Sequence, residues 1–173
     1  MLEGIKKNHY YCDDNVIMGS KLVKVGNAPK SAITYFGDGN WFLSNFFPCK
    51  VEYGGIIYPT IEHAFQAAKT LDKDLRMQIS HMKSPNEAKA AGRSLKLRPD
   101  WEKIKNDVMY KLLRLKFEQP YFRRRLLGTG SVLLIEGNWW HDTYWGVYEG
   151  RGQNMLGRML MRIRQELKEE QKK

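Results

Sequence analysis

The segment 60–69 constrains the fold of this 173-residue chain more than any other. Pro59 followed by Thr60 is typical of a helix start, with Thr60 as the N-cap residue. Apolar residues then recur every three or four positions, on one face of a helix that would pack against a core. These residues are Ile61, Ala64, Phe65, Ala68 and Leu71. We therefore expect a helix over 61–71 with one buried face.

Three polar residues, Glu62, Gln66 and Lys69, lie along the edge of that apolar face. Glu62 and Lys69 project in nearly the same direction, two turns and about 10 Å apart along the axis. Partial removal from water at such an edge gives titratable groups unusual pKa values. A structural interpretation stays open, in which the helix macrodipole favours Glu62 and Lys69 is an ordinary solvated lysine.

Length and composition fit a single domain, because 42% of the 173 residues are hydrophobic and can form a core. No apolar run reaches the roughly 18 residues of a membrane span, so we expect no membrane partner. Residues 1–7 do not have the pattern of a signal peptide. Cys12, Cys49 and the four histidines lack the spacing of a disulfide framework or a metal site. These patterns predict a cytoplasmic protein without a cofactor or a metal.

The net charge of +10 is unevenly distributed. Residues 93–126 contain eleven Lys or Arg and four Asp or Glu, which leaves +7 in that stretch. Such a density favours an anionic partner, either a nucleic acid or the phosphate of a small substrate. A solvated helix face rich in lysine is the alternative interpretation.

The chain divides into an N-terminal extension, residues 1–30, and a domain over 31–173. The short strand expected in the extension is 21–25. In the domain, Gly54–Gly55 between two β-type runs predicts a two-residue hairpin. The strands expected in the domain are 32–36, 50–53, 56–58 and a buried strand at 131–136.

Helices are expected over most of the remaining domain. Ser84 as N-cap, Pro85 at the first helical position and Glu87 in a capping box predict a helix that ends at Gly92. The other helices expected are 75–82, 101–117, 121–127 and a final helix that starts near Asn154. The fold class is therefore α+β, a helix-rich single domain with a small β-sheet.

Seven motifs occur in an order that resembles one known family. They are Phe42–Pro48 (FLSNFFP), Glu62–Lys69 (EHAFQAAK), Lys116–Phe117, Leu126–Gly130 (LLGTG), Ile135–Glu136, Asp142 with Trp145–Gly146, and Gly152–Gly157 (GQNMLG). Together they resemble the NADAR family, also called YbiA-like, over about residues 33–167. The resemblance implies the YbiA-like α+β fold.

The resemblance also implies an N-glycosidase, a hydrolase that cleaves the bond between ribose C1 and a nitrogen. Family substrates include phosphoribosylamino-pyrimidine intermediates of riboflavin biosynthesis and ADP-ribose attached to guanine, including guanine in DNA. The expected partner is thus a phosphorylated ribosyl or ADP-ribosyl substrate, or an ADP-ribosylated nucleic acid. Neither a cofactor nor a metal is expected, and the oligomeric state is left open.

Three residues are the candidate catalytic groups. Glu62 matches the family's helix glutamate and can stabilise positive charge at C1 or act as acid or base. Lys69 matches the family's helix lysine and can hold a phosphate, donate a proton, or attack C1 and form a Schiff base. Asp142 can bind ribose hydroxyls or assist Glu62, whereas an Asx-turn is its structural alternative.

Candidate substrate-binding residues come from several motifs. They are Phe42, Ser44, Asn45, Gln66, Trp101, Trp145, Gly146 and Asn154. The aromatic residues can stack on a base, although packing in the core is the commoner role, above all for Trp101 on its helical spacing. Ser44–Asn45 can bind sugar or base or simply turn the chain. The glycine-rich segment 146–157 leads into a helix N-terminus, which can bind phosphate through backbone N–H groups.

Two functions of other classes compete with the enzyme. A module that binds ADP-ribose or a nucleotide without cleaving it uses the same aromatic and phosphate sites but does not need Glu62. A basic nucleic-acid-binding protein uses the charged stretch 93–126, although no known nucleic-acid-binding motif is present.

Overall fold

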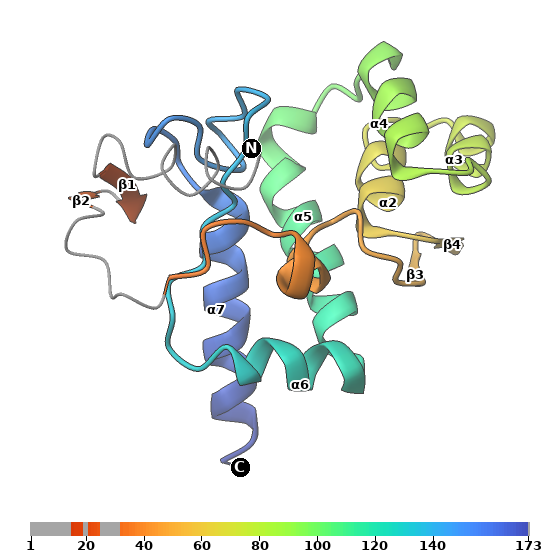
Figure 1. Cartoon of the computed structure of the whole chain (residues 1–173). Coiled ribbons are helices and arrows are strands. Elements are labelled where there is room, and N and C mark those ends of the chain that lie inside the picture. Colours follow the sequence, from red (N-terminus) through yellow and green to blue (C-terminus); the bar gives the residue numbers. More distant parts are fainter. Residues whose placement is uncertain (1–14, 19–20, 25–31, 173) are drawn as a thin grey trace. The chain divides into compact units, whose positions relative to one another are not determined.

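A computed structural model describes residues 15–18, 21–24 and 32–172. Two units are formed, one by Ser44–Arg123 and the other by the segments up to Leu43 and from Arg124 onward. Helices make up most of the unit Ser44–Arg123, and the strands are short (Figure 1).

The unit Ser44–Arg123 is built around one short, buried helix. Its elements are β3 (Val51–Tyr53), β4 (Ile56–Tyr58), α2 (Ile61–Ala67), α3 (Lys73–Ser80), α4 (Pro85–Ser94) and α5 (Trp101–Phe117). All seven residues of α2 are buried, and α2 contacts α3, α4, α5 and both strands. Figure 1 shows α3 and α4 beside α2, with the β3–β4 hairpin next to them. The apolar face predicted from the sequence is thus the centre of this unit.

The predicted hairpin at 50–58 is confirmed. β3 and β4 pair antiparallel, with Val51 opposite Tyr58 and Tyr53 opposite Ile56. Gly54 and Gly55 have φ of 61° and 78°. Such a two-residue turn requires positive φ at both positions, which glycine adopts without steric cost.

Several helix ends differ from the predictions: α3 covers 73–80 and not 75–82, and α6 covers 120–128 and not 121–127. α2 ends at Ala67 and not at Leu71, because Lys69 N–H donates to Gln66 O at 3.2 Å and Thr70 N–H to Ala67 O at 3.3 Å. These i to i+3 bonds tighten the last turn and stop the α-helical pattern. α4 continues through Gly92 to Ser94, so glycine does not end this helix. By contrast, α5 has the predicted limits, and Ser84 caps α4 by accepting from Glu87 N–H.

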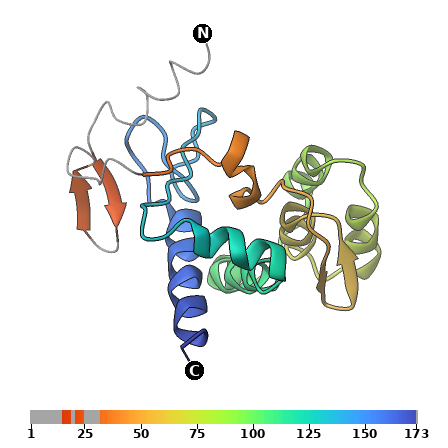
Figure 2. The same ribbon diagram turned by 60° about the horizontal axis from the view of Figure 1, so that its bottom comes forward.

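The second unit contains the remaining elements. They are β1 (Asn15–Met18), β2 (Lys21–Lys24), the 3₁₀ helix η2 (Asp38–Leu43), the C-terminal half of α6 (Pro120–Gly128), and α7 (Met155–Glu170). β1 and β2 form an antiparallel pair with Asn15 opposite Lys24, which Figure 2 shows as adjacent arrows. The strand predicted at 21–25 is therefore present, with Val25 outside the described residues. The proposed boundary at residue 30 stays a prediction.

Two predicted strands, 32–36 and 131–136, are reduced to a single parallel bridge between Ile33 and Leu134. Ile33 N–H donates to Leu133 O, and Ile135 N–H donates to Ile33 O, both at 2.8 Å. The buried character expected at 131–136 holds, because Leu133 and Ile135 form a core cluster with Val147. The prediction of a regular strand was wrong for both segments.

A side chain occupies part of the backbone edge of 131–136, next to the parallel bridge between Gly137 and Val147. Asn154 Nδ2 donates to Leu134 O at 2.9 Å, and its Oδ1 accepts from Glu136 N–H at 3.0 Å. A carboxamide offers the same donor and acceptor as a peptide group. Asn154 thus satisfies the backbone edge that a neighbouring strand would otherwise occupy.

The final helix, α7, provides the main apolar surface of this unit. The predicted core residues Leu156, Leu160, Ile163 and Leu167 are all buried. Arg164 is also buried, and it donates to Thr129 Oγ1 at 2.7 Å and to Val132 O at 2.9 Å. Among the described residues, no helix combines the length and the apolar composition needed to cross a bilayer.

Candidate active site

The start of α2 is fixed by two side chains that face its first turn. Thr60 is the N-cap, as predicted, and its Oγ1 accepts from His63 N–H at 3.2 Å. His63 Nδ1 lies 2.7 Å from Thr60 Oγ1, and Nε2 lies 3.2 Å from Met82 O. Burial lowers the pKa of His63, with smaller opposing effects from Met82 O and Glu87. A neutral imidazole fits these contacts, because Nε2–H donates to the carbonyl and Nδ1 accepts from the hydroxyl.

Glu62 is a buried carboxylate and not a solvated cap. Only 6% of the residue is exposed, and its Oε1 accepts from Gln66 Nε2 at 2.7 Å. Its backbone N–H donates to Asn45 O at 3.0 Å. Buried carboxylates are uncommon without a partner because desolvation disfavours the charge. The macrodipole alone therefore does not account for Glu62.

Lys69 lies in the turn after α2 and is half-buried. Its Nζ donates to Gly92 O at 3.4 Å. Burial lowers the pKa of Lys69, the Glu62 charge opposes this shift, and Arg93 and Lys89 add to it. The purely solvated lysine of the structural interpretation is thus excluded. The two groups interact even though α2 ends before Lys69.

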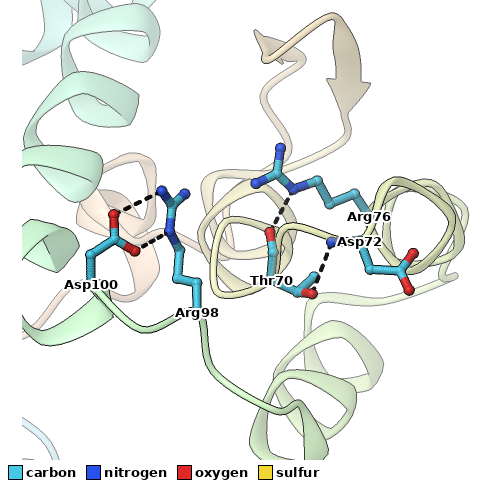
Figure 3. Close-up of polar contacts among 5 residues, drawn as sticks. All are labelled: Thr70, Asp72, Arg76, Arg98 and Asp100. Atoms are coloured by element: carbon cyan, nitrogen blue, oxygen red, sulfur yellow. Dashed lines mark hydrogen bonds and ion pairs between the residues drawn. The ribbon is translucent and has the colours of Figure 1, made fainter.

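One backbone N–H group and one side chain bind the carbonyl groups of this turn. Arg98 N–H donates to Lys69 O at 2.8 Å, and Arg76 Nε donates to Thr70 O at 2.7 Å. Asp72 N–H donates to Thr70 Oγ1 at 3.1 Å, and Arg98 forms two hydrogen bonds with Asp100, at 2.6 and 2.9 Å (Figure 3). Because the carbonyl groups of Lys69 and Thr70 both have partners, the position of Lys69 is set by the fold.

The loop Ser44–Asn45 is held in place by Lys116, which is part of a family motif but was not among the candidate site residues. Lys116 of α5 is fully buried, and its Nζ donates to Ser44 O at 2.8 Å. Its Nζ also lies 5.6 Å from the Phe47 ring centre and 5.2 Å from that of Phe122, within cation–π range. Lysine at a buried position of an amphipathic helix was the signal that could have revealed it.

Ser44 and Asn45 each use part of their hydrogen-bonding capacity within the fold. Ser44 Oγ accepts from Phe46 N–H at 3.2 Å, which is the turn given as an alternative. Asn45 Nδ2 donates to Met109 Sδ at 3.5 Å. Asn45 Oδ1 is buried and has no hydrogen-bond partner within the described part of the chain. Contact of this loop with a substrate stays a prediction.

Two of the predicted aromatic residues pack inside their own units. Trp101 is 5% exposed and lies 5.1 Å from the Phe65 ring, so its core alternative holds. Phe42 in η2 is 3% exposed, and the Arg125 guanidinium lies 4.2 Å from its ring centre. The guanidinium covers one face of the ring, and contact of Phe42 with a substrate stays a prediction.

Asp142 forms the Asx-turn that was its structural alternative. Its Oδ1 accepts from Tyr144 N–H at 3.0 Å and from Trp145 N–H at 2.8 Å. Asn138, fully buried, donates from Nδ2 to Asp142 O at 2.7 Å and accepts from Asp142 N–H at 2.9 Å. One carboxylate oxygen of Asp142 therefore serves the loop, and a catalytic role for the group stays a prediction.

The other predicted residues of this loop also contribute to its structure. A side chain at Gly146 would overlap the Glu136 carbonyl oxygen and lie 2.8 Å from Asn138 Nδ2. Trp145 is partly exposed and packs edge-on against Tyr144, with ring centres 5.0 Å apart. Asn154 is fully buried, and both ends of its amide bind backbone. Of these three residues, Trp145 alone keeps exposed surface for a ligand.

The N-terminus of α7, where a phosphate-binding role is expected, uses two of its N–H groups within the fold. Met155 N–H donates to Tyr144 O at 3.2 Å, and Leu156 N–H donates to Trp145 O at 3.0 Å. These are the N–H groups that a helix N-terminus otherwise offers to an anion. Asn154 takes a left-handed conformation, φ 50°, and makes no side-chain cap bond. The N–H groups of Met155 and Leu156 are therefore satisfied by the chain itself, and phosphate binding at this helix end stays a prediction.

The order of these residues and helices matches a known domain. Residues 34–168 match the NADAR domain. The chain belongs to the NADAR family. The resemblance seen in the seven motifs is thereby confirmed, and Glu62, Lys69 and Asp142 all lie within the matched region.

Other NADAR proteins have names that describe their activity or pathway. N-glycosidase YbiA of Escherichia coli (strain K12) is 43% identical over 129 residues, which cover 72% of this chain and 80% of that protein. Riboflavin biosynthesis protein PYRR, chloroplastic, of Zea mays is 36% identical over 144 residues, 72% of this chain and 23% of PYRR. Riboflavin biosynthesis protein VVA0006 of Vibrio vulnificus is 36% identical, and the match covers 37% of its length.

A solved structure supports the fold assignment. The NMR structure of the E. coli protein YbiA is 34% identical, with a TM-score of 0.73. The match covers 97% of this chain and 94% of the other. The predicted helix-rich α+β fold of the NADAR family is therefore confirmed.

Proposed function

We propose that this NADAR protein is an N-glycosidase that hydrolyses the bond between ribose C1 and a nitrogen. One observation carries the proposal: a buried carboxylate, Glu62, interacts with an amine, Lys69, whose pKa burial has lowered. Perturbed titratable pairs of this kind cluster at functional sites. The 43% identity to a protein named N-glycosidase YbiA supports the same conclusion.

Glu62 suits the charge that develops during this reaction. Departure of the nitrogen places positive charge on C1 and the ring oxygen, as in other glycoside cleavage. A carboxylate held by Gln66 at 2.7 Å stabilises that charge or removes a proton from the attacking group. The neutral amide of Gln66 fixes the carboxylate without neutralising its charge.

Lys69 suits a covalent route, since a lowered pKa increases the neutral fraction of an amine. The Nζ lone pair attacks C1 while the C1–N bond breaks, and the leaving nitrogen takes a proton from water. Nζ then loses a proton, the ring C1–O bond opens, and the ring oxygen is protonated, which leaves a C1=Nζ Schiff base. Addition of water releases the ribose aldehyde and restores the amine, so the net reaction is hydrolysis.

The substrate we propose is a phosphorylated ribosylamine linked to a pyrimidine, of the kind formed in riboflavin biosynthesis. The names of the relatives in maize and Vibrio vulnificus support this class. ADP-ribosylated guanine, as a nucleoside or in DNA, is the second candidate. The net charge of +10 favours it, because a longer anionic substrate gains more from such a charge.

A panel assay tests the proposal. The purified full chain is incubated with phosphoribosylamino-pyrimidines, ADP-ribosyl-guanosine and an ADP-ribosylated oligonucleotide, and products are followed by chromatography with mass detection. We expect free base and free ribosyl product from at least one substrate. Folded protein that binds ADP-ribose but releases nothing from any substrate would support the binding module instead. DNA affinity that falls steeply with salt, without hydrolysis, would support the nucleic-acid-binding alternative.

We also propose that the reaction is metal-independent and uses only side chains of the protein. The donors needed for the steps above are Glu62, Lys69 and water. We expect the same rate before and after dialysis against EDTA, measured on the best substrate of the panel. A rate lost in EDTA and restored by one divalent cation would overturn this part of the proposal and leave the N-glycosidase assignment standing.

A further inference from the structure

Gly92 of α4 contacts two polar side chains of the site, those of Gln66 and Lys69. A Cβ added to Gly92 would overlap Gln66 Oε1 and lie 2.6 Å from Gln66 Cδ. The Gln66 amide is thus pressed against the glycine backbone. On the other side, Lys69 Nζ donates to Gly92 O at 3.4 Å. One residue of α4 therefore contacts the side chains of both Gln66 and Lys69.

The environment of Gln66 leaves its amide a single orientation. The residue is 5% exposed, and its Nε2 donates to Glu62 Oε1 at 2.7 Å. Its Oε1 is buried and has no hydrogen-bond partner among the residues that the structure describes. If the Gln66 amide were rotated, its oxygen would face the Glu62 carboxylate oxygen. An amide oxygen and an ionised carboxylate both only accept hydrogen bonds, so no bond could form between them. The nitrogen must therefore face Glu62 and the oxygen must face Gly92.

The position of Gly92 within its helix is otherwise unfavourable. It is an interior residue of α4, where glycine costs roughly 1 kcal/mol relative to alanine. Its φ is not in the left-handed region, so the backbone conformation does not require glycine. The close approach of the Gln66 side chain therefore explains why residue 92 is glycine.

We propose that Gln66 and Gly92 are positioning residues for the reaction, and that Gly92 aligns the Gln66 amide which in turn aligns the Glu62 carboxylate. This inference rests on the proposed function and assigns Gln66 a role other than the substrate contact that the sequence suggested. It involves no direct contact between Gly92 and the substrate.

Substitution of Gly92 tests the proposal through kinetics. In Gly92→Ala the added methyl group displaces Gln66, and we expect kcat to fall by about 10² with KM nearly unchanged, as for a misplaced catalytic group. Gln66→Met, which keeps the size but lacks the donor, should have a similar fall. Gly128→Ala is the matched control, because a Cβ there meets nothing within 4 Å. A raised KM with retained kcat in Gln66→Met would make Gln66 a substrate contact and overturn the proposal.

The double variant separates positioning from damage to the helix. Removal of the Gln66 side chain makes room for the alanine methyl group, so Gly92→Ala with Gln66→Ala should be no slower than Gln66→Ala alone. This non-additivity is the signature of residues that act as a unit. Additive losses in kcat would mean that Gly92 acts through the fold of α4, and the proposal would fail.

A spectroscopic measurement does not depend on activity. The side-chain N–H₂ signals of Gln66, assigned in ¹⁵N-labelled protein by their loss in Gln66→Met, should exchange slowly in the wild type and faster in Gly92→Ala. Unchanged signals in Gly92→Ala would overturn the proposal even if the enzyme is active. If the panel assay shows no hydrolysis while these signals respond, the proposed function fails but the contact between Gly92 and Gln66 stands.

Discussion

Polar residues in two regions of this molecule have opposite kinds of partners. Around α2, Glu62 binds the side chain of Gln66 and interacts electrostatically with Lys69. In the segment 134–157, Asn154 and Asp142 bind backbone groups through their side-chain atoms. Both regions supplied family motifs, and both contain buried polar atoms, yet the buried carboxylate and the half-buried amine lie in the first.

The difference shows that burial of a polar residue does not by itself identify a catalytic group. A buried amide that replaces a strand, as Asn154 does, is required by the fold because its backbone partners would otherwise be unsatisfied. A buried carboxylate next to a half-buried amine is unfavourable for the fold and is therefore the better candidate for chemistry. The kind of partner, side chain or backbone, separates the two regions.

Glu62→Gln should give the largest loss of activity. The substitution keeps the shape and leaves an oxygen for Gln66 Nε2, so the fold should be retained, but it removes the charge and the acid–base function. We expect kcat to fall by about 10³ or more, within the range for general acid–base catalysis. Rates are measured by chromatography, and folding is checked by circular dichroism and thermal unfolding.

Glu52→Gln is the control for that substitution, because Glu52 lies exposed on β3 in the same unit. Its rate should match the wild type. Near-normal activity of Glu62→Gln would remove Glu62 from the mechanism, and the contrast between the two regions would lose its functional meaning.

Lys69 is tested by a pair of substitutions and by pH. Lys69→Met should lower kcat by about 10² or more, as expected for loss of an activated nucleophile. Lys69→Arg keeps the positive charge but cannot deprotonate, so it should be equally inactive if Lys69 attacks C1 and active if Lys69 only holds a phosphate. Borohydride added during turnover should trap a substrate adduct on Lys69 in the wild type; absence of an adduct would contradict the covalent route.

The pH profile follows from the direction of the shift. Burial favours the neutral amine and lowers the pKa of Lys69, so deprotonation occurs below the ordinary value of about 10.4. The rate should rise with pH and level off before that value is reached. Glu62, Lys89 and Arg93 are the charges that set the midpoint, and Lys89→Met should move it upward because one repelling charge is lost.

The features of the fold and of the α2 site that depend on residues close together in the chain were predicted from the sequence. The cap at Thr60, the capped start of α4 and the two-glycine turn involve neighbours in the chain, and the structure agrees with each. Glu62 and Gln66 are one helical turn apart, so their contact also follows from periodicity. The family motifs placed these residues in an enzyme before any geometry was available.

Contacts between distant residues were not predictable in this way. The amide of Asn154 binds Leu134 O, 20 residues away in sequence, in the place of a strand partner, and the regular strand expected at 131–136 was wrong. Lys116 binds Ser44 O across 72 positions, and Gly92 meets Lys69 across 23. Each contact depends on tertiary packing that overrides local preference, for example where glycine lies inside α4 rather than at its end.

Asn154→Ala should affect stability more than the catalytic step. Loss of the amide leaves Leu134 O and Glu136 N–H without their partner, and each unsatisfied buried group costs about 1–3 kcal/mol. We expect the free energy of unfolding to fall by about 2–4 kcal/mol, measured by urea denaturation. Gln153→Ala, at an exposed neighbour, serves as the control. A stable variant with lost activity would instead return Asn154 to the substrate-binding role.

Asp142→Asn should have the smallest effect and is the sharpest test of the contrast. Asparagine keeps an Oδ1 that can accept from Tyr144 N–H and Trp145 N–H, so the Asx-turn should survive. The fall in kcat should stay well below the ~10² expected for loss of an acid–base group. Asp142→Ala, which removes the acceptor, should lower stability by about 1–3 kcal/mol. If Asp142→Asn is as inactive as Glu62→Gln, Asp142 is catalytic as the family resemblance implied, and a backbone-bound side chain has a chemical role as well.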